Sequence, residues 1–301
     1  MNVISLFDGM SCGRIALEKL GIKVDNYYAA EIKPHAIEVT KHNYPDTKHL
    51  GDVRTVLDKI PDLSKIDLVI GGSPCQDFSQ ANRVRDGLQG EKSGLFYEFL
   101  KIVNAVKEAN PNMYFFLENV RMKKEHQDII SELMGVEPVN VNSKVLTAQL
   151  RNRFYWTNIP GFEFPEDKNV TLSSILTSGY TDRLKSRALL ESDSRPLTTP
   201  VKMFHRYYST GFTTLIFKSR EHYEACKEHY EANHKGKKGV EITESDPVYD
   251  GVRYLNKTEL ERLQTVPEGY TSILERDDAA CLLGDGWTVD VIVEFFKGLK
   301  T

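Results

Sequence analysis

The chain has 301 residues, 40% of them hydrophobic and 27% charged, which is ordinary for a soluble globular protein with one large α/β domain and a modest insertion. The net charge of −4 gives no overall sign of a nucleic-acid partner. The chain has neither a signal peptide nor an apolar run approaching the roughly 18 residues of a membrane span, and its four cysteines form no close CxxC pair, so we expect a cytoplasmic protein without disulfides.

The first half alternates short apolar runs with amphipathic stretches, which predicts βα units and a doubly wound, mostly parallel sheet. The predicted strands are residues 2–7, 26–30, 66–70 and 113–117. The predicted helices are residues 12–20, a stretch ending near 42, and 94–109. Residues 145–146 and 154–159 are predicted to form an antiparallel pair at the edge of this sheet.

Beyond Pro160 the α/β rhythm is lost until about Val252. Within this region a helix is predicted at Ser219–His234, with Ser219 as its N-cap and Gly236 as its terminator. Two further helices are predicted at 257–264 and 289–299. We therefore expect one large domain, formed by residues 1–160 and 252–301, interrupted by a smaller segment at 161–251.

A glycine-rich turn joins the first strand to the first helix, at the place where a doubly wound sheet binds a nucleotide-like ligand. Gly9 and Gly13 would let the backbone approach that ligand closely, and the helix N-terminus favours a carboxylate. A tight turn alone would explain these glycines equally well. However, Asp8, Glu31 and Asp52 stand at three successive strand ends, which favours an adenosine ligand. No third glycine is present for NAD, and S-adenosylmethionine, which needs no pyrophosphate cradle, fits better.

Cys75 follows the buried strand at 66–70, in the run Gly-Gly-Ser-Pro-Cys-Gln. A cysteine placed directly after a strand is exposed and held by the backbone, and such a site can lower the thiol pKa from about 8.5 so that the thiolate becomes a nucleophile. A lone cysteine is more often structural, and Cys12, Cys226 and Cys281 are interpreted in that way.

The motif around Cys75 is followed by Glu118-Asn119-Val120 and by Gln149-Leu150-Arg151-Asn152-Arg153. With this ordered set the chain resembles the cytosine-5 DNA methyltransferases. Its amino-acid sequence at 51–54, 70–75, 154–156 and 283–289 is most similar to the catalytic domain of the animal de novo enzymes. The resemblance does not extend to the regulatory domains of those enzymes. The resemblance implies a class I, Rossmann-like fold. It also implies a catalytic, cofactor-binding domain at 1–160 and 252–301, and a target-recognition segment at 161–251 whose variable part is about 200–250.

The resemblance implies methyl transfer from S-adenosylmethionine to C5 of a flipped-out cytosine in DNA. Attack of the Cys75 thiolate on C6 would make C5 electron-rich. Glu118 would share a proton with N3 of the base, while Arg151 and Arg153 would bind O2 and a nearby phosphate. Loss of the C5 proton would then release Cys75, and flipping the base would cost a few kcal/mol.

The cofactor site implied by the resemblance includes a tryptophan, Trp287, where most bacterial members have the asparagine of Gly-Asn-Ser-Val. Its ring face can meet a sulfonium as a cation–π pair. Phe7 and Leu95 match adenine-packing positions, although a role in the core is equally compatible with the sequence. The full predicted cofactor set is Phe7, Asp8, Gly9, Gly13, Glu31, Ile32, Asp52, Val53, Pro74, Leu95 and Trp287.

DNA contacts are expected from a loop at 76–92, which would close over the flipped base, and from the variable segment. Residues 201–239 contain eight Lys or Arg and four Glu. The predicted DNA-contacting residues are Gln76, Ser79, Arg83, Arg85, Thr199, Lys202, Arg206, Lys218 and Arg220. The aromatic residues predicted to stack on bases are Phe204, Tyr207, Tyr208, Tyr223 and Tyr230.

One face of the predicted helix at 219–234 carries three residue types that bind zinc, namely His222, Cys226 and His229. No fourth ligand has the usual spacing, so we interpret them as an ordinary helix face and predict no metal.

Two alternatives remain open. A tRNA cytosine-5 methyltransferase would share these motifs, but that branch usually has Pro-Cys-Gln-Pro-Phe-Thr where this chain has Gln-Asp-Phe-Ser after Cys75. A catalytically inactive DNA-binding relative would typically lose motifs that this chain keeps. Double-stranded DNA is the expected partner, and the sequence leaves open whether a cognate restriction endonuclease or a second copy in a homodimer is another.

Overall fold

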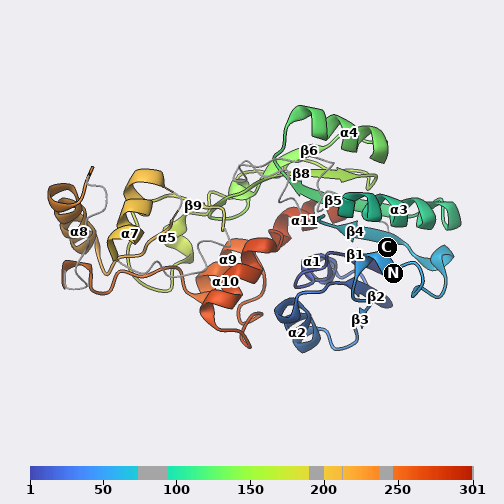
Figure 1. The fold of residues 1–301 in the computed structure, drawn as a ribbon, viewed down its shortest axis with the longest axis horizontal. Coiled ribbons are helices and arrows are strands. Elements are labelled where there is room, and N and C mark those ends of the chain that lie inside the picture. Colours follow the sequence, from blue (N-terminus) through green and yellow to red (C-terminus); the bar gives the residue numbers. More distant parts are fainter. Residues whose placement is uncertain (74–93, 190–199, 212, 237–246, 300–301) are drawn as a thin grey trace. The chain divides into compact units, whose positions relative to one another are not determined.

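The computed structural model describes residues 1–73, 94–189, 200–211, 213–236 and 247–299 (Figure 1). The chain divides into two compact units. Unit 1 consists of Met1–Asn142, Asn152–Pro165 and Gly286–Thr301, and unit 2 consists of Ser143–Arg151 and Glu166–Asp285. Within the described residues, no helix has both the length and the apolar character needed to cross a membrane.

Unit 1 is built on a seven-stranded sheet with the order β3-β2-β1-β4-β5-β8-β6. The strands are β1 (Asn2–Leu6), β2 (Asn26–Ala30), β3 (Lys48–His49), β4 (Leu68–Gly71), β5 (Tyr114–Val120), β6 (Val139–Asn142) and β8 (Asn152–Thr157). The first five in spatial order are parallel, whereas β8 runs antiparallel to both β5 and β6. The predicted doubly wound, mostly parallel sheet is confirmed.

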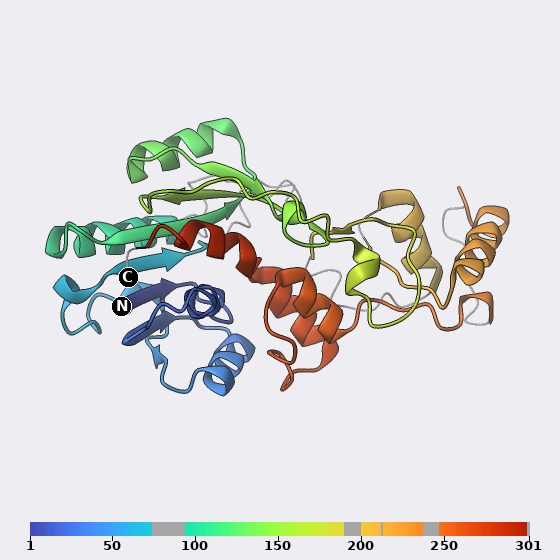
Figure 2. The ribbon, with the colours of Figure 1, turned by 180° about the vertical axis from the view of Figure 1, so that it is seen from behind.

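Helices cover both faces of this sheet (Figure 1), and Figure 2 shows the same unit from behind. They are α1 (Cys12–Lys19), α2 (Pro34–Asn43), α3 (Gly94–Ala109), α4 (Lys124–Met134) and α11 (Val289–Phe296). Strand β5 shows why both faces are apolar. Phe115 and Leu117 belong to the core cluster that includes residues of α3 and α4, whereas Phe116 packs edge-on against Phe295 and Phe296 of α11. Alternating side chains of a strand point to opposite faces, so a strand covered on both sides must be apolar throughout.

The antiparallel pair at the sheet edge was predicted with the wrong partner. The strand β8 pairs with β6, while Ser143–Val145 forms a single 3₁₀ turn. Strand β6 has the sequence Val-Asn-Val-Asn and is only partly buried, so its apolar signal is weak. The apolar pair at 145–146 reflects burial of Leu146 within a turn rather than a strand.

Unit 2 contains short helices, a two-stranded parallel pair and long connections. Its elements are β7 (Gln149–Leu150), β9 (Ser186–Arg187), α5 (Leu172–Ile175), α7 (Pro200–His205), α8 (Arg220–Asn233), α9 (Lys257–Gln264) and α10 (Arg276–Asp285). The predicted cap of α8 is confirmed, because the Ser219 side chain accepts a hydrogen bond from the backbone N–H of His222 at 3.2 Å.

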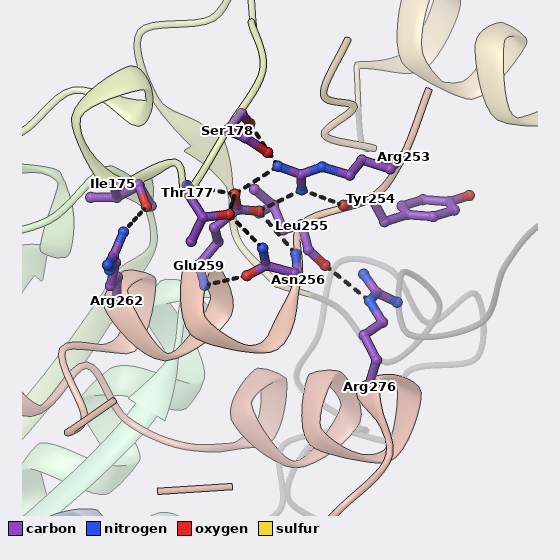
Figure 3. A network of polar contacts seen from close by, with 10 residues as sticks. All are labelled: Ile175, Thr177, Ser178, Arg253, Tyr254, Leu255, Asn256, Glu259, Arg262 and Arg276. Carbon is purple, nitrogen blue, oxygen red and sulfur yellow. Dashed lines mark hydrogen bonds and ion pairs between the residues drawn. The ribbon is translucent and has the colours of Figure 1, made fainter. Parts of the chain in front are cut away.

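Residues 252–285 cluster with unit 2, although the predicted large domain included them. The reason is a polar network around Glu259, shown in Figure 3. Glu259 is 0% exposed and accepts two hydrogen bonds from the Arg253 guanidinium, at 2.7 and 2.8 Å. It also accepts from the backbone N–H and the hydroxyl of Thr177, both at 2.9 Å, and from the N–H of Asn256 at 2.9 Å. The network thereby joins the start of α9 to the segment after α5.

Burial alone would raise the pKa of the Glu259 carboxyl, but the hydrogen bonds from Arg253, Asn256 and Thr177 outweigh it and lower the pKa below its ordinary value. A carboxylate with a lowered pKa stabilises the folded state above its unfolded pKa. That contribution is lost as the pH falls through the lower, folded-state value.

We expect Glu259→Gln to destabilise the protein by about 2–4 kcal/mol at pH 7, because Arg253 loses the counter-charge that holds it. Urea unfolding followed by circular dichroism measures this. The control is Glu268→Gln, since Glu268 pairs with Arg262 at 2.8 Å but is exposed, and should change stability by at most about 1 kcal/mol. Equal unfolding midpoints for the two variants would contradict a stabilising role for this network.

Candidate active site at the carboxyl edge of the sheet

Three parallel strands reach the same edge of the sheet in unit 1. Leu6 of β1 pairs in register with Gly71 of β4, and Gly71 pairs with Leu117 of β5. The chain leaves β1 and β4 at this edge, whereas β5 continues to Val120 alongside β8 and carries Glu118 there. This edge is where doubly wound sheets bind their ligands.

The turn after β1 holds a half-buried carboxyl group, Asp8. Its Oδ1 accepts a hydrogen bond from the Tyr27 hydroxyl at 2.8 Å, and its Oδ2 accepts one from the Ser11 hydroxyl at 2.6 Å. Burial raises the pKa of Asp8 to about 6, against the opposing effect of hydrogen bonds from Ser11, Ser5 and Tyr27. Asp8 is thus ionised at neutral pH and close to its titration range.

Glu31 directly follows β2, and its carboxylate links the turn after β1 to the turn after β2. Its Oε2 accepts from the Gly9 N–H at 2.8 Å, and its Oε1 accepts from the N–H groups of Ile32 and Lys33, each at 2.8 Å. Gly9 has a φ of +59°, a conformation that glycine adopts without strain. The Ile32 side chain is exposed.

Asp52 follows β3 and is engaged by its neighbour in the sequence. Its carboxylate accepts from the backbone N–H of Arg54 at 2.9 Å and from the Arg54 guanidinium at 3.0 and 2.7 Å. The hydrogen bonds from Arg54 lower the pKa of Asp52. A ligand amine at Asp52 would therefore share the carboxylate with Arg54. Val53 is buried in the adjacent core.

Two glycines at this edge make room for other side chains. A Cβ atom on Gly13 would lie 2.2 Å from Cδ1 of Ile70 and 3.6 Å from Cζ3 of Trp287. A Cβ atom on Gly72 would lie 2.9 Å from Nε1 of Trp287 and 3.1 Å from Oε2 of Glu118. The lack of a side chain on Gly13 thus lets Ile70 pack against the start of α1. The predicted approach of a ligand to the Gly13 backbone stays a prediction.

Trp287 packs edge-on against Phe116, with ring centroids 5.6 Å apart, and is only 9% exposed. The indole therefore lies over the sheet edge, with its Nε1 and the Glu118 carboxylate on the same side of Gly72. In the predicted cation–π contact, the sulfonium would have to reach the small exposed part of the Trp287 ring. That contact stays a prediction.

The structure brings together two of the predicted catalytic side chains. Glu118 is 8% exposed, and its Oε1 accepts from Nε of Arg153 at 2.9 Å. The two residues come from neighbouring antiparallel strands, since Arg153 pairs in register with Val120. Arg153 also donates from Nη1 to the backbone oxygen of Asn152 at 2.9 Å.

The other predicted arginine has a different environment. Arg151 belongs to unit 2, where it is buried and donates to the backbone oxygen of Gly284 at 3.1 Å. Arg153 thus contacts Glu118, whereas Arg151 donates to a backbone oxygen of unit 2. Their predicted contacts with the base and a phosphate stay predictions.

The remaining predicted cofactor positions divide into two groups. Phe7 and Leu95 are partly buried against the core cluster of unit 1, which favours the core role that the sequence left open. The second group is Pro74, which lies outside the described residues. The same holds for the predicted nucleophile Cys75 and for the predicted DNA-contacting residues Gln76, Ser79, Arg83, Arg85 and Thr199, and for the side chain of Lys202.

The prediction that the aromatic residues of the variable segment stack on bases is wrong. Phe204, Tyr207, Tyr223 and Tyr230 are buried, and Tyr208 packs against them as part of one cluster. The hydroxyl groups of Tyr207 and Tyr223 both donate to the Asp182 carboxylate. A segment this short has few other apolar residues from which to build a core, so its aromatic rings are needed there.

The basic residues of the variable segment are placed unevenly. Lys218 and Arg220 are exposed and Arg206 is half-buried. However, the exposed positions of α8 also carry Glu221, Glu224, Glu228 and Glu231, so the outer face of this helix is acidic. A phosphate backbone would be repelled by that face. The contacts of Arg206, Lys218 and Arg220 with DNA stay predictions.

Two of the three α8 residues whose types can bind zinc, His222 and Cys226, form hydrogen bonds within the protein. His222 accepts from the Lys218 N–H at 3.1 Å through Nδ1, and its Nε2 lies 2.8 Å from the Val248 backbone oxygen. The Cys226 thiol donates to the same oxygen at 3.2 Å, and burial raises its pKa to about 11. Both side chains hold the turn Pro247–Tyr249 on α8.

Sequence reasoning missed Tyr27, which binds the Asp8 carboxylate. It lies in the middle of a predicted strand, and an apolar strand residue with a hydroxyl gives no local sign that its oxygen reaches the neighbouring turn. It also missed Asp182, whose two tyrosine partners lie 25 and 41 residues away.

Comparison with known proteins gives a consistent result. A family model described as C-5 cytosine-specific DNA methylase matches residues 1–301. Type II methyltransferase M.NgoBV from Neisseria gonorrhoeae is 32% identical over 205 residues, covering 60% of this chain and 47% of that protein. DNA (cytosine-5)-methyltransferase DRM2 from Oryza sativa subsp. japonica is 36% identical over 118 residues, covering 36% of this chain and 20% of that protein. The chain thus spans half or less of the length of these relatives.

A solved structure extends the likeness of the fold to the whole chain. A DNMT2 mutant from Spodoptera frugiperda superimposes with a TM-score of 0.68 at 18% identity, over 99% of both chains. This confirms the predicted Rossmann-like fold.

We expect Gly72→Ala to lower methyl transfer at least tenfold, because the added methyl group displaces the Trp287 indole, the Glu118 carboxylate or both. Steady-state rates with a tritiated methyl donor measure this. The control is Gly94→Ala, since a Cβ atom on Gly94 would meet no atom within 4 Å. Adding Trp287→Phe to Gly72→Ala should recover part of the loss. A Gly72→Ala enzyme as active as the Gly94→Ala enzyme would show that this close packing has no catalytic importance.

Proposed function

Because the chain belongs to the C-5 cytosine-specific DNA methylase family, we propose that it methylates C5 of cytosine in double-stranded DNA. S-adenosylmethionine is the methyl donor of this family. The observation that carries the proposal is the buried ion pair of Glu118 and Arg153, at the sheet edge from which the Cys75 segment departs. A carboxylate held by a guanidinium is suited to recognise a base and to move a proton on it.

The donor would be held by the acidic residues at the ends of β1, β2 and β3. A sulfonium donor carries positive charge, an amine, ribose hydroxyls and an adenine amine, and all of these suit carboxylate acceptors. Asp8, Glu31 and Asp52 supply such acceptors. Trp287 would border the same site on the side of Glu118.

In the proposed mechanism, the Cys75 thiolate forms a bond to C6 of the flipped cytosine. Glu118 would share a proton with N3, where negative charge builds up, and Arg153 would hold the Glu118 carboxyl group in place. The electron pair at C5 would take the methyl group of the donor, whose sulfur–methyl bond breaks, so that S-adenosylhomocysteine leaves. Transfer of the C5 proton to solvent would return the electron pair of the C5–H bond to the ring and break the Cys75–C6 bond. The thiolate is thereby released, and N3 gives the shared proton back to Glu118.

Several features support DNA rather than tRNA as substrate. The curated relatives include proteins named as type II and as DNA (cytosine-5)-methyltransferases. The residues after Cys75 are Gln-Asp-Phe-Ser rather than Gln-Pro-Phe-Thr. Retention of Glu118 and Arg153 as a buried pair also favours an active enzyme over an inactive DNA-binding relative.

We assign target recognition to the variable part of residues 161–251, within unit 2. Because the outer face of α8 is acidic, the contacts are proposed to come from Lys202 and Arg206, from Lys218 and Arg220 at the N-terminal end of α8, and from Thr199. Phosphate contacts from such residues position the protein, whereas base contacts in the grooves specify the sequence.

We expect Cys75→Ser to lower methylation of DNA at least 100-fold, because a serine hydroxyl is a much weaker nucleophile than a thiolate. Affinity for S-adenosylhomocysteine, measured by calorimetry, should stay within about twofold because the thiol acts on the base and not on the donor. DNA with 5-fluorocytosine at the target should trap wild-type enzyme in an adduct that survives denaturation, since fluorine cannot leave as a proton does. Methylation by Cys75→Ser at a tenth of the wild-type rate or more would refute the covalent mechanism.

A further inference from the structure

A buried hydrogen bond links the ends of β4 and β5 beyond their last paired residues. Asn119 is 1% exposed and Ser73 is 4% exposed, and Nδ2 of Asn119 donates to Oγ of Ser73 at 3.1 Å. The two strands are in register as far as Gly71 and Leu117. After that point β5 continues alongside β8, while the chain that follows β4 leaves the sheet.

The orientation of the Asn119 amide is fixed by a second contact. Its Oδ1 accepts from the backbone N–H of Val120 at 2.8 Å. A backbone N–H can only donate, so the oxygen must face Val120 and the amide nitrogen must face Ser73. The amide therefore has one arrangement, and the Ser73 oxygen is the acceptor.

Ser73 stands two residues before Cys75 in the sequence, and Pro74 lies between them. A proline fixes its own φ and disfavours the helical conformation of the residue before it. Few rotatable bonds thus separate Ser73 from Cys75, which are joined by at most about 7 Å of chain. Because so few bonds can rotate, we expect a shift of Ser73 to displace Cys75 as well.

We propose that Asn119 and Ser73 are positioning residues, whose buried hydrogen bond sets where the Cys75 segment leaves the sheet relative to Glu118. Asn119 directly follows Glu118, so a single strand carries both the acid and the group that places the nucleophile. This inference rests on the proposed role of Cys75. It predicts that loss of the hydrogen bond slows the chemical step without weakening substrate or donor binding, because misplacement of a reacting group by about 1 Å can cost 10²-fold in rate.

The test compares Ser73→Ala with Ser131→Ala. Ser131 is a matched control, because it also lies in unit 1, is 6% exposed, and accepts one side-chain hydrogen bond, from Nε1 of Trp156 at 3.0 Å. Full-length variants are mixed with duplex DNA containing 5-fluorocytosine and with S-adenosylmethionine, at a temperature where melting curves show all of them folded. The rate of adduct formation is followed in a single turnover.

We expect Ser73→Ala to slow adduct formation and kcat by the same factor, at least tenfold, with KM for the donor and Kd for DNA within about twofold of wild type. Ser131→Ala should form the adduct at the wild-type rate even if it lowers the melting temperature equally. Ser73→Thr, which keeps the hydroxyl, should recover at least a third of the wild-type rate.

Adduct formation by Ser73→Ala at the wild-type rate would overturn the inference and leave the proposed function intact. Equal slowing in Ser73→Ala and Ser131→Ala would also overturn it, because the effect would then belong to packing in general. Failure of the wild-type enzyme to form any adduct would instead refute the proposed covalent function, and the positioning role with it.

Discussion

The common register of three parallel strands is the constraint on which the rest of the site depends. Leu6, Gly71 and Leu117 lie in one row, so the chain leaves β1 and β4 at the edge of the sheet where β5 carries Glu118 beyond its last pairing with β4. Backbone pairing thus brings together Asp8, the start of the cysteine segment and the proposed catalytic acid before any side chain takes part. The side-chain contacts, Asp8 with Tyr27 and Glu118 with Arg153, then refine positions that the backbone already determines.

Gly72 packs closely against two residues with different proposed partners. Trp287 is proposed to contact the methyl donor, and Glu118 is proposed to contact the base. A side chain at Gly72 would collide with the Trp287 indole and approach the Glu118 carboxylate. The Trp287 indole is therefore accommodated by a glycine that directly follows β4. The positions of Trp287 and Glu118 therefore depend on the absence of a side chain at Gly72.

Local sequence patterns predicted the elements whose signal is local. The helices at 94–109 and 257–264 were predicted with the observed bounds, because the apolar period of each lies within the segment itself. The role of Arg151 and the burial of Tyr207 and Tyr230 depended instead on partners far along the chain. Residue type alone does not distinguish an aromatic side chain that stacks on a base from one that fills a small core. Nor did it reveal that Arg253 and Glu259 form an ion pair in unit 2, to which residues 252–285 belong.

The substrate is the central claim, and nucleoside mass spectrometry tests it most directly. DNA and RNA are isolated from cells that express the wild-type chain or Cys75→Ser, and each pool is digested and its 5-methylcytosine quantified. The proposed function predicts a rise in 5-methylcytosine in DNA from wild-type cells alone, with RNA unchanged. A rise in the RNA pool with none in DNA would contradict it, and would identify the chain as an RNA-acting member of the same family.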